Sequence, residues 1–241
     1  MMRKNPKKMS KTLGAEEALF LLSLEGADVF DLFARANRVR EEHKGREARL
    51  CSIINARSGL CPEDCAFCSQ SARFKTQSQV YPLLPLNEIL DRAVKVKEMG
   101  AREYSIVTSG YSPTAEELRT VREAVRLVKE KTGLETCASL GALSREELLS
   151  LKEAGLDNYH HNLETARSFF PQVVTTHSYE DEVAAVKAAK DVGLKVCCGG
   201  IFGMGETREQ RLELLMALKD LAVDHLPINF LNPIPGTPLE G

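Results

Sequence analysis

The stretch CPEDCAFC, residues 61–68, decides how this chain is interpreted. Its cysteines, Cys61, Cys65 and Cys68, follow a C-x-x-x-C-x-x-C spacing. Electron-transfer ferredoxins supply a cysteine to every iron of a 4Fe-4S cluster, so three thiolates leave one iron open to a small-molecule ligand. The spacing therefore predicts a 4Fe-4S cluster that takes part in chemistry rather than one that only stores electrons.

This pattern is typical of radical S-adenosylmethionine enzymes, in which the open iron binds S-adenosylmethionine and an electron from the cluster cleaves the C–S bond of that cofactor. Phe67 directly precedes the last cysteine, as an aromatic residue usually does in that superfamily. A zinc site is the alternative, but tetrahedral zinc normally takes four Cys or His ligands and no fourth candidate lies nearby in the sequence. A disulfide framework is disfavoured because seven cysteines is an odd number and no apolar signal segment precedes the chain.

Length and composition indicate a cytoplasmic enzyme. The chain has 241 residues and 43% hydrophobic content, enough for one large core. No run approaches the roughly 20 apolar residues of a membrane helix. The formal net charge is -2, and the only basic run, residues 1–11, is expected to be a solvated tail. We therefore expect no nucleic-acid partner and no membrane partner.

Strand-like and helix-like segments alternate along the chain, which predicts an α/β fold. A helical region is expected at about 15–45, before the first strand. The expected strands are 49–55, 103–109, 134–140, 156–163, 194–203 and 226–232. The expected helices between them are 86–100, 114–133, 144–155, 179–193 and 207–221.

The chemistry-bearing residues follow different strands, which favours a TIM-type (β/α) barrel over an open sheet with one switch point. The cysteine motif follows the first strand, Asn162 and Glu164 end the fourth, residues 199–206 end the fifth, and Asn229 lies on the sixth. Six βα units of about 35 residues fall short of the eight in a complete barrel. We therefore expect an incomplete barrel at 49–241 after an N-terminal helical extension at 1–48, and a fragment of a longer protein.

The chain resembles the biotin synthase family. The resemblance runs from about residue 50 to 240 through SGLCPEDCAFCSQSARF, GLETCASLG, AGLDNYHHNLET, KVCCGGIFGMGET and LPINFLNPIPGTPLE, in that order. It implies a radical S-adenosylmethionine sulfurtransferase that abstracts hydrogens from two carbons of dethiobiotin and inserts a sulfur from an auxiliary iron-sulfur cluster. The implied partners are dethiobiotin, an electron donor such as flavodoxin or ferredoxin, and a second copy of the chain in a homodimer.

The resemblance also assigns site residues. Cys61, Cys65 and Cys68 would hold the 4Fe-4S cluster, and Glu164 would accept from the ribose hydroxyls of the cofactor. The cofactor-binding set it implies is Phe67, Asn162, Glu164, Gly200, Ile201, Gly203 and Glu206. The substrate-binding set it implies is His160, Asn162 and Asn229. The glycines of the turn at 199–206 would let the backbone approach the adenosine.

The auxiliary cluster is where the chain departs from the family pattern. Well-known members place cysteines on the second, third and fifth strands, with an arginine from a late strand that would lie beyond residue 241. Cys137 and Cys197 match the third and fifth strands, but Ser105, a poor iron ligand, stands on the second. Cys51 on the first strand is expected to replace the missing ligand, so that Cys51, Cys137 and Cys197 hold the auxiliary cluster. Cys198 should point the opposite way and pack in the core.

Two other interpretations remain. A related radical enzyme, such as a hydrogenase-maturation or methylornithine-forming relative, would share the barrel and the first cluster but act on another small molecule. A non-catalytic metal-binding protein built on a broken barrel is supported only by the short C-terminus. Production of 5'-deoxyadenosine would separate an enzyme from a binding protein.

Overall fold

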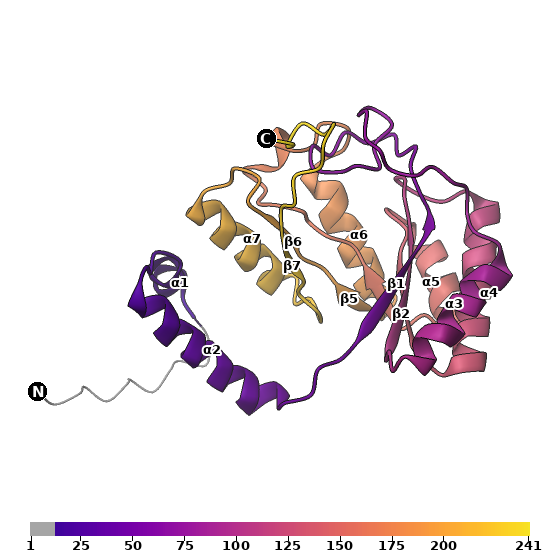
Figure 1. The fold of residues 1–241 in the computed structure, drawn as a ribbon, viewed down its shortest axis with the longest axis horizontal. Coiled ribbons are helices and arrows are strands. Elements are labelled where there is room, and N and C mark those ends of the chain that lie inside the picture. Colours follow the sequence, from indigo (N-terminus) through magenta and orange to yellow (C-terminus); the bar gives the residue numbers. More distant parts are fainter. Residues whose placement is uncertain (1–12) are drawn as a thin grey trace, which may run out of the picture.

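The computed structural model describes residues 13–241, so the basic tail expected at 1–11 lies outside the described residues. Two helices come first, α1 (Ala15–Leu22) and α2 (Ala27–Lys44). They form an arm that leads into the first strand. Within this arm, α1 packs against the outer helix α7. Figure 1 shows this arm in indigo beside the barrel. The expected helical region at 15–45 is confirmed.

Strands and helices alternate over the rest of the chain, as the sequence predicts. The strands are β1 (Cys51–Arg57), β2 (Glu103–Thr108), β3 (Glu135–Ser139), β4 (Asn158–His160), β5 (Lys195–Cys197), β6 (Gly200–Phe202) and β7 (Ile228–Phe230). The helices are α3 (Leu86–Glu98), α4 (Ala115–Thr132), α5 (Arg145–Glu153), α6 (Tyr179–Asp191) and α7 (Arg208–Asp220), with a short 3-10 helix η1 (Phe170–Gln172) before α6.

All strand pairs are parallel. β1 to β5 form one sheet in sequence order, and β6 pairs with β7 in a second. The prediction of one fifth strand over 194–203 is therefore wrong, because the chain leaves the first sheet after Cys197 and re-forms a strand at Gly200. Backbone bridges between Cys197 and His225 and between Glu164 and Gly200 keep the two sheets continuous. The result is an incomplete α/β barrel.

Capping residues in the sequence determine where most of the barrel helices begin. Four of them, α4, α5, α6 and α7, start with a reciprocal capping box, in which a Ser or Thr side chain accepts from the N3 backbone and the N3 side chain accepts from the N-cap backbone. Gly133 then ends α4 in a left-handed conformation. These signals are local, which is why the helix boundaries were predictable.

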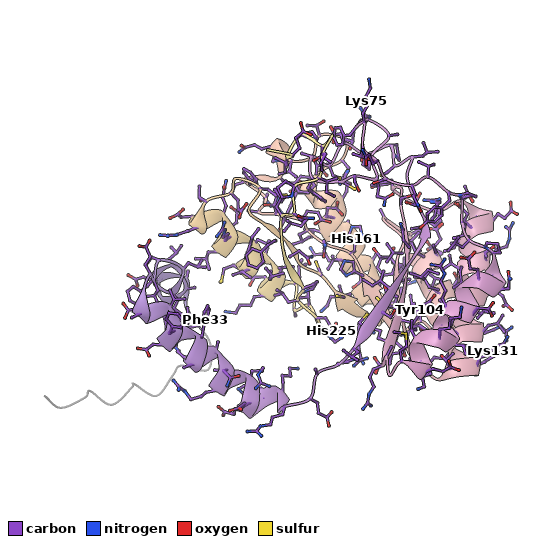
Figure 2. All side chains as sticks on the ribbon, viewed as in Figure 1. Phe33, Lys75, Tyr104, Lys131, His161 and His225 are labelled. Atoms are coloured by element: carbon purple, nitrogen blue, oxygen red, sulfur yellow. The ribbon has the colours of Figure 1, made fainter. Side chains whose placement is uncertain are left out.

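The main core lies between the sheet and its outer helices. Outward-facing strand residues such as Ile54, Tyr104 and Ile106 are 1–2% exposed and pack against buried helix residues such as Val121 and Val125. The Tyr104 hydroxyl donates to the Ile89 carbonyl of α3 at 3.0 Å. Figure 2 labels Tyr104 at this layer between strands and helices. Because these side chains face outward, the alternate residues of each strand are left to line the lumen.

No helix within residues 13–241 is long and apolar enough to cross a membrane.

Candidate active site

The predicted cluster cysteines lie on the loop after β1, at one wall of a cavity of about 440 Å³. The loop is folded back by hydrogen bonds from the Cys61 amide to the Gln70 carbonyl (3.0 Å) and from the Cys68 amide to the Cys65 carbonyl (2.9 Å). Burial, with a smaller effect of the neighbouring thiols, raises the pKa of Cys65. Seven predicted site residues line this cavity: Cys61, Cys65, Phe67, Cys68, His160, Asn162 and Glu164.

A carboxylate inside the motif holds the cysteine loop in place. Asp64 accepts from the backbone amides of Thr175 (2.9 Å) and Thr176 (3.2 Å), and from the hydroxyls of both. Burial raises the pKa of Asp64, but these hydrogen bonds outweigh it and lower the pKa to about 2. The Ala66 amide also donates to the Val173 carbonyl at 2.9 Å. The cysteine loop is therefore fastened to a segment more than 100 residues away in the sequence.

A chain of ionisable side chains continues from this loop into the barrel. His177 contacts Glu63 through Nδ1 (2.6 Å) and Glu182 through Nε2 (2.7 Å). Glu182 also contacts His161 Nε2. Burial lowers the pKa of His177, but the hydrogen bonds to Glu182 and Glu63 raise it to about 9. Figure 2 labels His161 in the interior of the barrel. This relay, defined as Glu63, His177, Glu182 and His161, links the cysteine loop to the end of β4.

Asn162 and Glu164 lie at the end of β4, on the cavity. Glu164 has a left-handed backbone with φ 61°, and its side chain contacts Asn162 Nδ2 at 3.4 Å. Burial, together with the charge of Glu182, raises the pKa of Glu164 to about 8. Asn162 Oδ1 accepts from the Gly199 amide at 3.0 Å. A buried carboxyl of this kind gains most from a ligand that brings hydroxyl donors.

The glycine-rich segment serves close packing of the protein backbone. A Cβ at Gly199 would lie 1.7 Å from the Pro227 carbonyl oxygen, and one at Gly200 would lie 2.4 Å from the Glu164 carbonyl oxygen. Gly200 also belongs to β6 and not to a turn, which corrects the sequence-based expectation. Glu206 accepts from the amides of Gly203 and Met204, both at 2.8 Å. Its carboxylate therefore shapes the turn that follows β6.

Five predicted residues do not line this cavity: Gly200, Ile201, Gly203, Glu206 and Asn229. Asn229 lies on β7, in register with Ile201 on β6. Their roles toward the cofactor and the substrate stay predictions.

The three remaining predicted thiols lie on β1, β3 and β5, where Cys51 is exposed, Cys197 is half-buried and Cys137 is buried. The strand register shows how they are placed relative to one another. Cys51 on β1 pairs with Glu103 on β2. Cys137 on β3 pairs with Ser105, which is two residues further along β2 than Glu103. The two odd-numbered strands are thus staggered by two residues across the strand between them.

The same stagger recurs between β3 and β5. Cys137 pairs with Asn158 on β4, and Cys197 on β5 pairs with His160, two residues further along β4. Two residues over two strand steps is an average stagger of one residue per strand. An eight-stranded barrel has this stagger, and in such a barrel the inward side chains of alternate strands form one layer. Cys51, Cys137 and Cys197 therefore occupy a single layer, which we call the thiol layer. Cys198 is fully buried in the outer core, as expected.

Comparison with known proteins decides the family. The profile of the family described as the Radical SAM superfamily matches residues 57–218. The biotin synthase of Citrifermentans bemidjiense is 52% identical over 93% of this chain and 69% of its own length. That of Trichlorobacter lovleyi is 53% identical over 95% of this chain and 69% of its own length.

The chain belongs to the biotin synthase family. The chain spans about two thirds of the length of these relatives. A solved methylornithine synthase is similar in structure, with a TM-score of 0.86 and 26% identity, covering 95% of this chain and 67% of its own. A hydrogenase maturase from Carboxydothermus hydrogenoformans has a TM-score of 0.79 at 19% identity, covering 93% and 55%, which shows the shared fold alone. The sequence identity of this chain to the two biotin synthases, 52% and 53%, is about twice its identity to the methylornithine synthase, 26%.

Membership in this family implies a 4Fe-4S cluster, S-adenosylmethionine and an auxiliary cluster, and the donor sets of this biotin synthase family member fit them. Residues 13–241 contain no group of three or more His, Cys, Asp or Glu side chains placed to hold a single metal ion. A cluster distributes its thiolates over separate irons, so its ligands need not converge on one point. Cys61, Cys65 and Cys68 share one cavity wall, and the thiol layer supplies a second set of three.

Sequence reasoning missed the residues that support this biotin synthase site. Asp64 and Glu63 stand inside the quoted motif but were not assigned a role, and His161 adjoins the assigned His160. Nothing in the sequence distinguishes His177 or Glu182 from ordinary residues at the start of a helix. His177 contacts Glu63 across more than 100 residues, and Glu182 contacts both His177 and His161, so only the fold brings the four side chains together.

Proposed function

We propose that this chain carries the dethiobiotin-to-biotin sulfurtransferase chemistry of its family. One observation supports this most directly, namely that the cysteine-loop cavity and the thiol layer open into the same lumen. Ile53 and Asn55 line the cavity and lie on the same face of β1 as Cys51. His160 lines the cavity and pairs in register with Cys197. A radical source and a sulfur source are both needed, and the two donor sets are adjacent.

When bound, the first cluster and S-adenosylmethionine supply hydrogen-abstracting radical chemistry. Cys61, Cys65 and Cys68 would hold that cluster, with Asp64 and the relay orienting their loop. Glu164 would accept from the ribose hydroxyls once it has lost its proton. The turn after β6, shaped by Glu206, would border the adenosine.

His160 suits a neutral substrate. Burial lowers the pKa of His160 to about 4, so its imidazole is uncharged at neutral pH and offers one donor and one acceptor. A ureido ring needs the same pairing without charge. Asn229 on β7 and Asn162 on β4 would complete the contacts to dethiobiotin. The protein's contribution is then to position the substrate between the two clusters.

The same proposal includes the electron donor, the location, the division of the chain and the oligomeric state. An electron donor such as flavodoxin or ferredoxin is needed because the first cluster must be reduced before it acts. A cytoplasmic location is supported by seven free cysteines, which suit a reducing compartment. Residues 1–48 would form an extension and 49–241 the barrel, since α2 ends at Lys44 and β1 begins at Cys51. The oligomeric state is open in the sequence, and light scattering would test whether the chain forms a homodimer.

The test uses anaerobically reconstituted, reduced protein with S-adenosylmethionine and dethiobiotin, and it quantifies 5'-deoxyadenosine and biotin in the same samples. Both products are expected. Deoxyadenosine without biotin would place the defect at the thiol layer or the substrate contacts. The absence of both products would contradict the proposal, and deoxyadenosine formed only with another small molecule would favour a related radical enzyme.

A further inference from the structure

A second hollow, of about 530 Å³, lies on the other side of the cysteine loop from the cofactor cavity. Leu60 and Pro62 line this hollow, whereas Cys61 and Glu63 line the cavity. Consecutive Cα atoms are only about 3.8 Å apart, so the cysteine loop itself is the wall between the two. We call the hollow the outer groove, and it is lined by residues 57–60, 62, 80–82 and 109–112.

Apolar side chains of the outer groove are exposed. Leu60 is 72% exposed, Val80 is 59% exposed and Tyr111 is 39% exposed. The backbone nearby is fixed, since Ser58 and Tyr81 exchange two backbone hydrogen bonds of 3.1 Å. Leu60 has a left-handed backbone with φ 53°, which is uncommon for a residue other than glycine. An exposed apolar surface with a polar rim is typical of a protein interaction site.

The walls of the outer groove are joined by contacts between β1, β2 and α4. The groove lies at the ends of β1 and β2, which pair directly with each other. Arg57 at the end of β1 donates to the Ser109 carbonyl at 2.9 Å and to Glu117 of α4 at 2.6 Å. Glu117 therefore neutralises the Arg57 charge. The contacts that shape these walls lie between residues 57 and 117.

The charge at the rim of the outer groove is positive. Arg73 is exposed, and its Nε donates to the Pro62 carbonyl at 2.8 Å, which places the guanidinium beside the groove. Lys75 is exposed as well, and Figure 2 shows its side chain projecting into solvent. Neither cation has an ion-pair partner within residues 13–241.

The carboxylates of the cysteine loop are engaged elsewhere. Glu63 lines the cofactor cavity and contacts His177 at 2.6 Å. Asp64 accepts from the backbone amides of the 175–176 segment. These negative charges are held by groups that do not line the outer groove, so the two exposed cations set the sign of the field at its rim.

These features suit an electron-carrying protein better than a small molecule. The first cluster must receive an electron, and the outer groove is one residue from its predicted ligand Cys61. Electron-transfer encounters use small interfaces, usually below about 1,200 Å². A positive rim attracts an acidic partner and speeds its encounter. A small-molecule site would need a few polar groups that converge on the ligand, and Arg57 is already paired.

We propose that the outer groove and its positive rim form the docking surface for the protein that reduces the first cluster, and that this donor is a small acidic one-electron carrier. The inference deepens the proposed function and rests on it, because it presumes a first cluster that must be reduced. One electron leaves the reduced donor, which is oxidised by one electron, and enters the cluster across the cysteine loop. No bond forms or breaks at this surface.

The experiment measures how fast the reconstituted full chain is reduced, without dethiobiotin. Flavodoxin hydroquinone and a reduced 2Fe-2S ferredoxin are the acidic probes, and dithionite is a small reductant that needs no docking surface. The EPR signal of the reduced cluster in freeze-quenched samples follows each reaction.

Two substitutions alter the surface and two are matched controls. Val80→Asp replaces an exposed apolar side chain of the groove by a charged one of similar size, and Lys75→Glu reverses a charge at the rim. Val94→Asp is the control on α3, where Val94 is 40% exposed. Lys131→Glu is the control on α4, where Lys131 is exposed and lies far from Lys75 (Figure 2). Circular dichroism compares the folding of all the chains.

Val80→Asp and Lys75→Glu should each lower the second-order rate constant with both carriers about 5- to 10-fold and leave the dithionite rate unchanged. The loss in Lys75→Glu should disappear in about 1 M NaCl, where the Debye length is about 3 Å. The two control variants should change neither rate.

Equal rates with the carriers in the original chain and all variants would overturn the docking surface. Failure of both carriers to reduce a chain that dithionite reduces would overturn the choice of partner. Both results leave the proposed function intact, because the measurement requires no biotin. A reconstituted chain that dithionite does not reduce would overturn the proposed function, and this inference with it.

Discussion

Replacing His177 by Gln tests whether the relay holds a protonated imidazole between two carboxylates. The His177 side chain is 9% exposed, and its two nitrogens lie 2.6 Å from Glu63 and 2.7 Å from Glu182. The hydrogen bonds to these carboxylates outweigh burial and raise the pKa of His177 to about 9, from an ordinary value of 6.5. Glutamine keeps a hydrogen-bonding amide but cannot carry the charge.

The sign and size of the effect follow from linkage. Because the folded pKa lies above the unfolded one, the stabilisation from the charged imidazole is fully present below pH 6.5 and is lost as the pH rises through 9. The interval corresponds to about 3 kcal/mol, at about 1.4 kcal/mol per pH unit. The difference in unfolding free energy between the original chain and the Gln variant should therefore shrink by about 3 kcal/mol between pH 6.5 and 9.

The measurement is urea unfolding of the reduced, metal-free chain at several pH values from 6 to 9.5. His225→Gln is the control, because His225 is exposed on the loop before β7, away from the relay (Figure 2). Its unfolding free energy should track that of the original chain at every pH. A difference between the original chain and His177→Gln that stays constant over this range would refute a charged imidazole in the relay.

Four further substitutions probe the two donor sets and the cofactor contact. Asp64→Asn should release the cysteine loop, so that iron of the first cluster is lost to a chelator about 3- to 10-fold faster, as followed by absorbance. In calorimetric titration above pH 8, where Glu164 has lost its proton, Glu164→Gln should weaken binding of S-adenosylmethionine about 10- to 100-fold, because a charge-assisted hydrogen bond contributes about 1.5–3 kcal/mol. Cys197→Ala should abolish iron binding at the thiol layer, whereas Cys198→Ala should leave it intact and cost about 1–2 kcal/mol of stability through lost packing.

Each of these predictions has an outcome that would contradict it. Glu180→Gln is the control for Glu164, since Glu180 is 60% exposed and pairs only with Arg167 among the described salt bridges. Equal weakening by Glu164→Gln and Glu180→Gln would argue against a direct cofactor contact. Equal iron in Cys197→Ala and Cys198→Ala would remove Cys197 from the ligand set, and unaltered chelation in Asp64→Asn would show that its hydrogen bonds do not hold the loop.

Much of the site could be predicted from the sequence because its signals are local. The spacing of Cys61, Cys65 and Cys68 lies within eight residues, and all three line one cavity wall in the structure. The capping boxes that begin four helices span only four residues each. Family resemblance added Asn162 and Glu164, and both lie at that cavity.

The sequence was a weaker guide where the chain changes sheets. Residues 194–203 look like one continuous strand, but the backbone divides after Cys197 because β6 pairs with β7 and not with β4. Gly199 and Gly200 permit this step, since neither position has room for a Cβ against Pro227 or Glu164. Which backbone lies against a glycine cannot be read from the glycine itself.

By itself, the sequence determined the reaction class, the α/β alternation and the resemblance to a sulfur-inserting family. Only the tertiary structure decided that Cys51, Cys137 and Cys197 form one layer, that Cys51 contacts Glu103, and that His177 joins the cysteine loop to α6. The physical reason is that these contacts join segments about 50 to more than 100 residues apart. The stagger of the strands and the return of each helix over the sheet set those distances, and neither is written in any single stretch of the chain.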